Sequence, residues 1–151
     1  MPDQGGVAGE QLIRAWEDRL GMTESNHAAA VRSFWDSIEA RDWDAARALL
    51  DDRCVTEWPH SRERFEGGDA YIEMNRAYPE GWRITVLSVA AQGDLAVSEI
   101  RVDQDERVFF AASFFEFGLA NTVVRLHELW VTSPYEEPAE WRAPWSRPLE
   151  V

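Results

Sequence analysis

The hydrophobic pattern of the chain changes its period once, near Pro79. Before this proline, apolar residues mostly recur every three to four positions, which predicts amphipathic helices. After it, apolar and polar residues alternate through four long runs, which predicts strands joined by short turns. Helices followed by a meander of strands indicate one α+β domain with its helices on one face of a sheet. We expect a strongly curved antiparallel sheet that, with the helices, forms a cone around one internal pocket.

Turn and capping residues divide the two halves into elements. Gly21 is expected to end a short first helix, and Ser25 or Asn26 to cap a second. Asp42 or Asp44 then restarts a short helix, and Pro79 ends the last one. One predicted helix covers 10–20, a second follows Ser25 or Asn26 and buries residues up to Ile38, a third is short and is broken by Asp51-Asp52, and a fourth covers about 70–78. The predicted strands cover 54–58, 82–91, 95–102, 107–117 and 122–132, with 60–64 as an exposed loop.

The charge balance excludes several function classes. The formal net charge is −13, with no basic stretch that could neutralise phosphates, so we expect no nucleic-acid partner. An anionic membrane surface is disfavoured for the same reason. All 15 basic residues are arginine. Schiff-base chemistry and phosphate-binding loops that end in lysine are therefore excluded.

The cysteine and histidine content argues against disulfide, thiol and metal chemistry. Cys54 is the only cysteine and lies in a predicted strand, where a small buried side chain is expected. The three histidines, His27, His60 and His127, lack the spacing of a metal site. We predict neither a metal nor another cofactor.

The order of elements predicts three regions. Residues 1–24 form an N-terminal segment with a short helix, residues 25–133 form the domain, and residues 134–151 form an extended Pro- and Trp-rich tail. Trp141 and Trp145 are expected to hold this tail against the domain. Met1–Gly9 lacks the pattern of a signal peptide, and no apolar run could span a membrane, so a soluble cytoplasmic protein is expected.

Several segments resemble a known superfamily. They are Ile38–Asp44, Leu49–Asp52, Thr56–Pro59, Tyr78-Pro79, Val123–Trp130 and Pro138–Arg142. In this order they resemble the nuclear transport factor 2-like, or SnoaL-like, superfamily over about residues 25–145, and the last segment is similar to uncharacterised actinobacterial members. The resemblance implies a cone fold with an apolar pocket. It does not single out an activity, because the superfamily includes isomerases, cyclases, hydrolases, dehydratases and binding modules.

Ketosteroid isomerases of this superfamily use a carboxylate base and two oxyanion donors. Their positions correspond to Trp58, Phe34 and Ser113 in this chain. None of these side chains can carry a proton between carbon atoms, so that chemistry is excluded.

Limonene epoxide hydrolases offer a second comparison. Their Arg-x-Asp strand motif is matched by Arg101 and Asp103, and Glu128 falls at their second acid position. The Tyr and Asn that hold the water in that family are replaced by Val55 and Glu57. The resemblance therefore implies a partial hydrolase site in which Arg101 pairs with Glu128, or with Glu99 on its own face.

Polyketide cyclases of the superfamily use a His and an acid beside an apolar cleft. His127 and Glu128 are of the right kind, but adjacent strand residues face opposite sides, so only one can enter the cavity. We expect Glu128 to be a general acid or base whose pKa is raised by burial. Arg101 would orient it, Asp103 would complete the charged set, and Tyr78 would donate a hydrogen bond.

The remaining candidates are expected to form the ligand-binding wall. They are mostly aromatic or apolar and come from helices and strands on both sides of the predicted pocket: Phe34, Trp58, Asn75, Ser113, Phe115, Leu126 and Trp130.

Two functions remain open. One is a cofactor-free enzyme that acts on a small lipophilic metabolite by epoxide hydrolysis, cyclisation, isomerisation or dehydration. The other is a small-molecule-binding or accessory domain without turnover. In either case the apolar residues on both faces of the sheet predict a homodimer through its open face.

Overall fold

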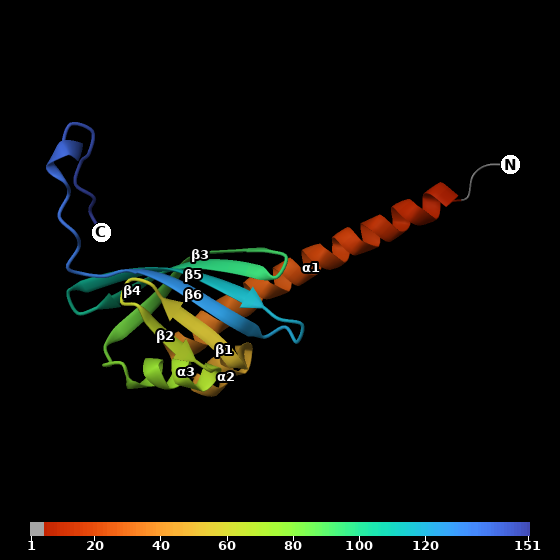
Figure 1. The fold of residues 1–151 in the computed structure, drawn as a ribbon, viewed down its shortest axis with the longest axis horizontal. Helices are drawn as coiled ribbons and strands as arrows, with labels where there is room; N and C mark the ends of the chain where they lie inside the picture. Colours follow the sequence, from red (N-terminus) through yellow and green to blue (C-terminus); the bar gives the residue numbers. More distant parts are fainter. Residues whose placement is uncertain (1–4) are drawn as a thin grey trace.

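The structure, a computed structural model, describes the backbone of residues 5–151 and the side chains of residues 9–19 and 21–151. The elements follow the predicted order of helices and then a strand meander (Figure 1). They are α1 (Gly5–Ala40), α2 (Trp43–Leu49), β1 (Leu50–Trp58), β2 (Glu63–Glu66), α3 (Gly68–Ala77), β3 (Trp82–Gln92), β4 (Leu95–Gln104), β5 (Arg107–Phe117), β6 (Val123–Val131) and a short 3₁₀ turn, η1 (Glu140–Arg142).

The six strands form one open sheet in the order β2-β1-β6-β5-β4-β3. The strand pairs are antiparallel, as expected, except that β1 pairs with β6 in parallel. A parallel pair needs a long connection, and here the rest of the fold between the two strands supplies it. The segment expected as a loop also contributes, since β2 pairs antiparallel with β1.

One face of the sheet carries the core. Along β4 the residues Ala96, Ser98, Ile100 and Val102 are buried, and those between them are more exposed. The Trp35 indole of α1 donates to Ser98 Oγ at 2.9 Å, which fixes the helix on this inner face. In Figure 1 the helices α2 and α3 lie on one side of the sheet, and among the described residues the opposite, outer face is not covered by a helix.

The N-terminal helix is continuous where a break was expected. α1 runs through Gly21 and through Ser25 and Asn26, which therefore cap nothing. A glycine inside a helix costs only about 1 kcal/mol relative to alanine. The packed part of the helix offsets that cost, because Glu24 accepts a hydrogen bond from Gly93 N and His27 bonds Gly93 O, both in the turn between β3 and β4.

The short helices begin and end where turn chemistry requires. Asp42 caps α2 by accepting from Ala45 N at 3.1 Å. Before α3, Gly67 has a φ of 95°, and a Cβ there would lie 3.2 Å from the Asp52 carbonyl. The positive φ favours glycine at this bend. After α3, Tyr78 is extended before Pro79, as predicted.

The C-terminal tail is not held by its tryptophans. Trp141 is 73% exposed and Trp145 is 80% exposed, so the expected anchoring is wrong. The contact near its start is a hydrogen bond from the Tyr135 hydroxyl to the Val108 carbonyl, 2.8 Å long. Beyond it, the tail rises away from the sheet (Figure 1).

No helix within residues 5–151 is long and apolar enough to cross a membrane.

Candidate functional site

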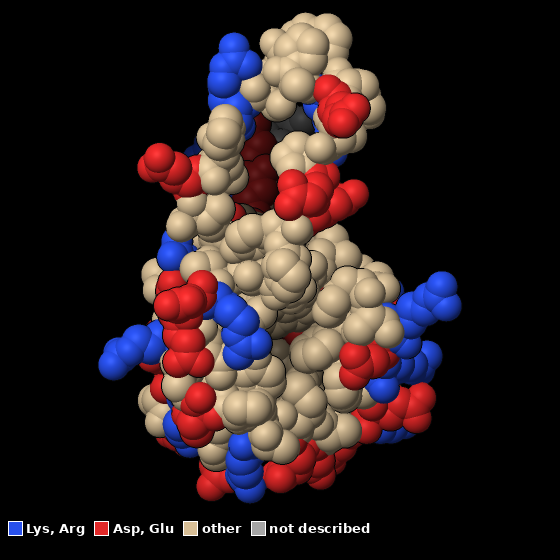
Figure 2. Space-filling view, turned by 90° about the vertical axis from the view of Figure 1, so that its left-hand side faces the viewer, with Lys and Arg blue, Asp and Glu red and all other residues tan. Residues whose placement is uncertain are grey.

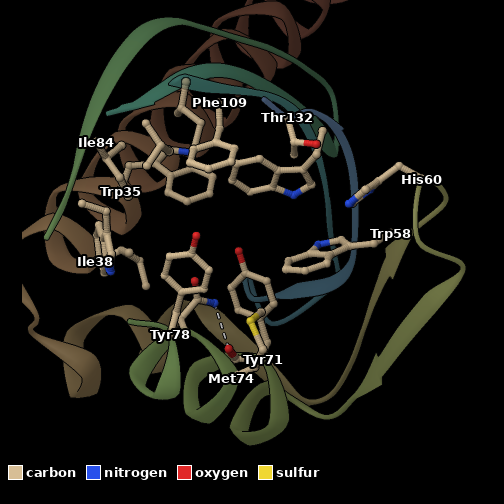
Figure 3. A pocket seen from close by; sticks show the side chains of 15 residues that line it. Trp35, Ile38, Trp58, His60, Tyr71, Met74, Tyr78, Ile84, Phe109 and Thr132 are labelled. Atoms are coloured by element: carbon tan, nitrogen blue, oxygen red, sulfur yellow. Dashed lines mark hydrogen bonds between the residues drawn. The ribbon is translucent and has the colours of Figure 1, made fainter. Parts of the chain in front are cut away.

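A pocket of about 160 Å³ lies between the inner face of the sheet, α1 and α3 (Figure 3). An engineered apolar cavity of about 150 Å³ holds benzene, so this space suits a single small ring. The exposed lining residues His60, Tyr78 and Thr132 mark its mouth. Figure 2 views the end of the molecule from which the tail leaves and shows a narrow hollow within uncharged surface. The full lining is Trp35, Ile38, Trp58, His60, Tyr71, Met74, Asn75, Tyr78, Trp82, Ile84, Ile100, Val102, Phe109, Trp130 and Thr132.

Glu128 is fully buried behind one wall of this pocket. Register places it on the inner face, beside Ser113 of β5. Its Oε2 accepts from the Trp58 indole at 2.6 Å, and its Oε1 accepts from the Ser113 hydroxyl at 3.0 Å. The Tyr71 hydroxyl lies 3.2 and 3.4 Å from the two oxygens. These donors are all neutral, and Glu128 itself is not part of the pocket lining.

Burial sets the protonation of this carboxyl group. Desolvation raises the pKa of Glu128 above its ordinary value of 4.5, and the Trp58, Ser113 and Tyr71 donors oppose that shift in part. The Trp130 indole N–H also favours the ionised form, although its Nε1 makes no hydrogen bond within the described residues. Burial likewise raises the pKa of the Tyr71 phenol well above 10, and the Glu128 carboxyl adds to this.

The predicted pairing of Arg101 with Glu128 is wrong. Arg101 and Asp103 lie on the outer face of β4, where Arg101 Nη2 is 2.8 Å from Asp103 Oδ1. The strand register places Ser98, not Arg101, in line with Ser113 and Glu128. The sheet therefore separates the Arg-x-Asp motif from the pocket, and Asp103 cannot join Glu128 in a hydrolase-like set.

The other catalytic candidates also separate by face. Glu128 turns inward, and His127 lies on the outer face with its Nδ1 3.7 Å from Glu57 Oε2. Tyr78 lies at the pocket mouth and donates to Gln104 Oε1 at 2.9 Å. Figure 3 shows the hydroxyl groups of Tyr71 and Tyr78 both pointing into the cavity.

The predicted wall residues divide into two groups. Trp58, Asn75 and Trp130 line the pocket, as expected. Phe34, Phe115 and Leu126 are buried in the core behind it, and Ser113 is buried as a donor to Glu128. The lining that they were expected to provide comes from other side chains, because α1 turns Trp35 and Ile38, rather than Phe34, toward the cavity.

Tyr71 is a candidate site residue that the sequence analysis missed. It lines the pocket and also contacts Glu128. Tyr71, Asn75 and Tyr78 are spaced at i, i+4 and i+7, which places them on one face of α3 and its C-terminal end. This polar spacing on a helix that packs on the core would have indicated a pocket face.

Thiol and metal chemistry find no support in this site. Cys54 is buried, and desolvation raises the pKa of its thiol to about 11, so it stays protonated. Among the described side chains, no three His, Cys, Asp or Glu residues are placed to hold a metal ion.

Comparison with known sequences decides the family. The sequence model of the SnoaL-like domain family matches residues 31–127, which is well over half of the chain. The chain belongs to the SnoaL-like family. The curated proteins contain no match to this SnoaL-like protein.

Solved structures support the same fold. A Kribbella flavida protein named as a candidate ketosteroid isomerase is 25% identical, with a TM-score of 0.75 over 85% of this chain and 93% of that one. A LEH-like epoxide hydrolase from M. tuberculosis is 18% identical, with a TM-score of 0.61 over 71% and 84% of the two chains. A candidate SnoaL-like polyketide cyclase from Shewanella putrefaciens is 11% identical, with a TM-score of 0.59 over 70% and 89%.

Proposed function

We propose that this SnoaL-like protein binds a small, neutral, mostly apolar molecule in the pocket between α1, α3 and the sheet. One observation carries the proposal: none of the described residues that line the pocket is Asp, Glu, Arg or Lys. A charged ligand would lose its hydration there without gaining a counter-ion, which costs several kcal/mol. The proposed ligand is therefore uncharged.

The shape and chemistry of the wall narrow the ligand further. Aromatic faces from α1, β1, β3 and β6 favour a flat ring, and the volume of about 160 Å³ suits one ring rather than several. The hydroxyl groups of Tyr71 and Tyr78 point into the pocket and donate their protons to Glu128 and Gln104. Their oxygens are therefore polar points that would accept a hydrogen bond from a hydroxyl or amide group of the ligand.

Calorimetric titration with three one-ring probes that differ in charge tests this proposal. The probes are acetophenone, benzoate and benzylamine at neutral pH. We expect acetophenone to bind at least ten-fold more tightly than either charged probe. Equal affinity for all three probes would contradict the proposed selection for a neutral ligand.

A pair of matched variants locates the binding. Met74→Trp fills the pocket, and Met22→Trp places the same side chain on the exposed surface of α1. Acetophenone binding is expected to weaken at least ten-fold in Met74→Trp and to remain unchanged in Met22→Trp. Unchanged binding in Met74→Trp would place the site elsewhere.

Acid–base catalysis is a second candidate, favoured by the buried carboxyl of Glu128. Its raised pKa suits a general acid, and Tyr71 contacts both this carboxyl and the pocket. Epoxide hydrolysis, cyclisation, isomerisation and dehydration all need such a group. Turnover of limonene oxide or styrene oxide would support this candidate if Glu128→Gln lowers kcat at least 100-fold. Turnover that persists unchanged in Glu128→Gln would end it.

A further inference from the structure

The N-terminal part of α1 carries an apolar stripe that nothing in the described chain covers. Contacts with the sheet begin at Glu24 and His27, which bond the turn between β3 and β4. Residues 9–23 extend beyond this point and are called the overhang here (Figure 1). Within it, Leu12 is 62% exposed and Trp16 is 56% exposed, and Ile13 is similarly open.

The exposed stripe continues the buried one. Leu12 and Trp16 fall on the same side of α1 as Val31, Phe34 and Ile38, within about 100° on a helical wheel. The part of this stripe beyond His27 is packed in the core. Most of the stability of a helix in a protein comes from packing of its apolar face, which the overhang lacks, so the overhang gains most from a partner on that side.

The C-terminal tail also exposes large apolar side chains. Trp141, Trp145 and Leu149 are all strongly exposed on an extended, proline-rich segment. The overhang and the tail leave the body at opposite ends, so neither covers the other within one chain (Figure 1). Both rise on the side of the sheet opposite α2 and α3, where the outer face carries Phe110, Leu129 and Val131.

The exposed area is large enough to supply an interface with a second copy of the chain. The chain exposes 10597 Å². A compact monomer of 17.3 kDa would expose about 7,800 Å², which leaves a surplus of roughly 2,800 Å². A standard interface buries about 800 Å² per partner, and obligate dimers bury more than about 1,000 Å² per partner. The surplus therefore covers the needs of a permanent dimer.

We infer that, in a dimer formed through the outer face of the sheet, the two copies exchange their ends, so that the tail of each copy packs on the overhang of the other. Consider a twofold axis perpendicular to the plane of Figure 1, on the outer side of the sheet. It places the second copy with its tail at the end where the first copy has its overhang. It brings the tail of one copy beside the overhang of its partner. Both apolar segments are then covered by one closed, symmetric assembly.

Two single variants and their mixture test this exchange by sedimentation velocity. Trp16→Glu alters the overhang, and Trp141→Glu alters the tail. We expect each variant to raise the dimer Kd at least ten-fold, and Leu119→Glu, on the exposed turn after β5, to leave it unchanged. Far-UV circular dichroism and the urea midpoint check that each variant is folded.

The mixture separates the exchange from other dimers. In a homodimer of either variant, both tail–overhang contacts contain one altered side. In the mixed dimer, one contact contains both alterations and the other contains none. We therefore expect the equimolar mixture to dimerise at concentrations where each variant alone is a monomer.

Two results would overturn the inference. A mixture no more associated than the single variants would indicate that the overhang and the tail do not contact each other. A wild-type chain that stays monomeric at 100 µM would exclude the dimer altogether.

Discussion

Glu128 shows at the residue scale how burial changes the role of a charged side chain. Its carboxyl group is surrounded by neutral donors from three elements, with no arginine among them. Each donor contributes about 1.5–3 kcal/mol when it serves a charged acceptor, which limits the cost of burial without removing it. Glu128 therefore fixes Trp58 and Tyr71 as pocket walls whether or not it takes part in chemistry.

The raised pKa of Glu128 predicts a definite pH dependence of stability. The folded protein holds this proton more tightly than the unfolded chain, so Glu128 favours folding at low pH. That contribution is lost as the pH rises from 4.5 through the raised pKa of the folded state. Glu128→Gln removes the titration, so its stability relative to wild type is expected to increase over this range. Urea unfolding from pH 4.5 to 8 measures it, and a constant difference would contradict the prediction.

Truncation of the same side chain is expected to act differently. Glu128→Ala leaves the Trp58 indole and the Ser113 hydroxyl without their acceptor and opens a cavity in the core. We expect a loss of about 3 kcal/mol in the free energy of unfolding, compared with the mild effect of Glu128→Gln. The contrast between the two variants separates hydrogen bonding from charge.

At the scale of elements, α1 continues through Gly21, a residue that disfavours the interior of a helix. A Cβ at Gly21 meets nothing within 4 Å. Gly21→Ala is therefore expected to stabilise the helix locally by about 0.5–1 kcal/mol. Circular dichroism at 222 nm would rise in magnitude. A fall would mean that Gly21 ends the helix in solution, as the sequence pattern predicted.

Gly67 provides the matched control for that substitution. Its positive φ and the nearby Asp52 carbonyl make the same change to alanine unfavourable. Gly67→Ala is expected to lower the free energy of unfolding by about 1–2 kcal/mol. Equal effects of the two alanine substitutions would contradict the assigned backbone conformations.

At the scale of the whole molecule, repulsion among acidic groups opposes folding. The formal net charge is −13, so many acidic groups have no arginine to pair with. Surface ion pairs, such as those of Arg41, Arg47 and Arg125, compensate only part of the acidic charge. Exposed ion pairs contribute roughly 0–1 kcal/mol each. Raising NaCl from 10 to 200 mM shortens the screening length several-fold and weakens the repulsion more than it weakens these pairs.

We therefore expect added salt to raise the Tm by about 2–4 °C, which corresponds to roughly 1 kcal/mol for a chain of this length. Differential scanning calorimetry at fixed protein concentration measures the shift. Sucrose at matched osmolality serves as the uncharged control. A Tm that falls with salt would mean that the ion pairs outweigh the repulsion.

The sequence by itself determined the element order and much of the local structure. The strand at 107–117 and the helix end at Tyr78-Pro79 follow from alternation and turn chemistry, which act over a few residues. Four of the residues proposed for the site from the sequence, Trp58, Asn75, Tyr78 and Trp130, line the pocket in the structure.

Only the tertiary structure decided which side chains meet. Alternation shows that Arg101 and Asp103 share a face, but the pairing of β4 with β5, and of β5 with β6, decides that Glu128 lies on the other face. A shift of one residue in register would reverse that result. The parallel pairing of β1 with β6 and the contact between Tyr71 and Glu128 join residues 57–73 positions apart. No local pattern encodes such contacts, because they depend on how the whole chain packs.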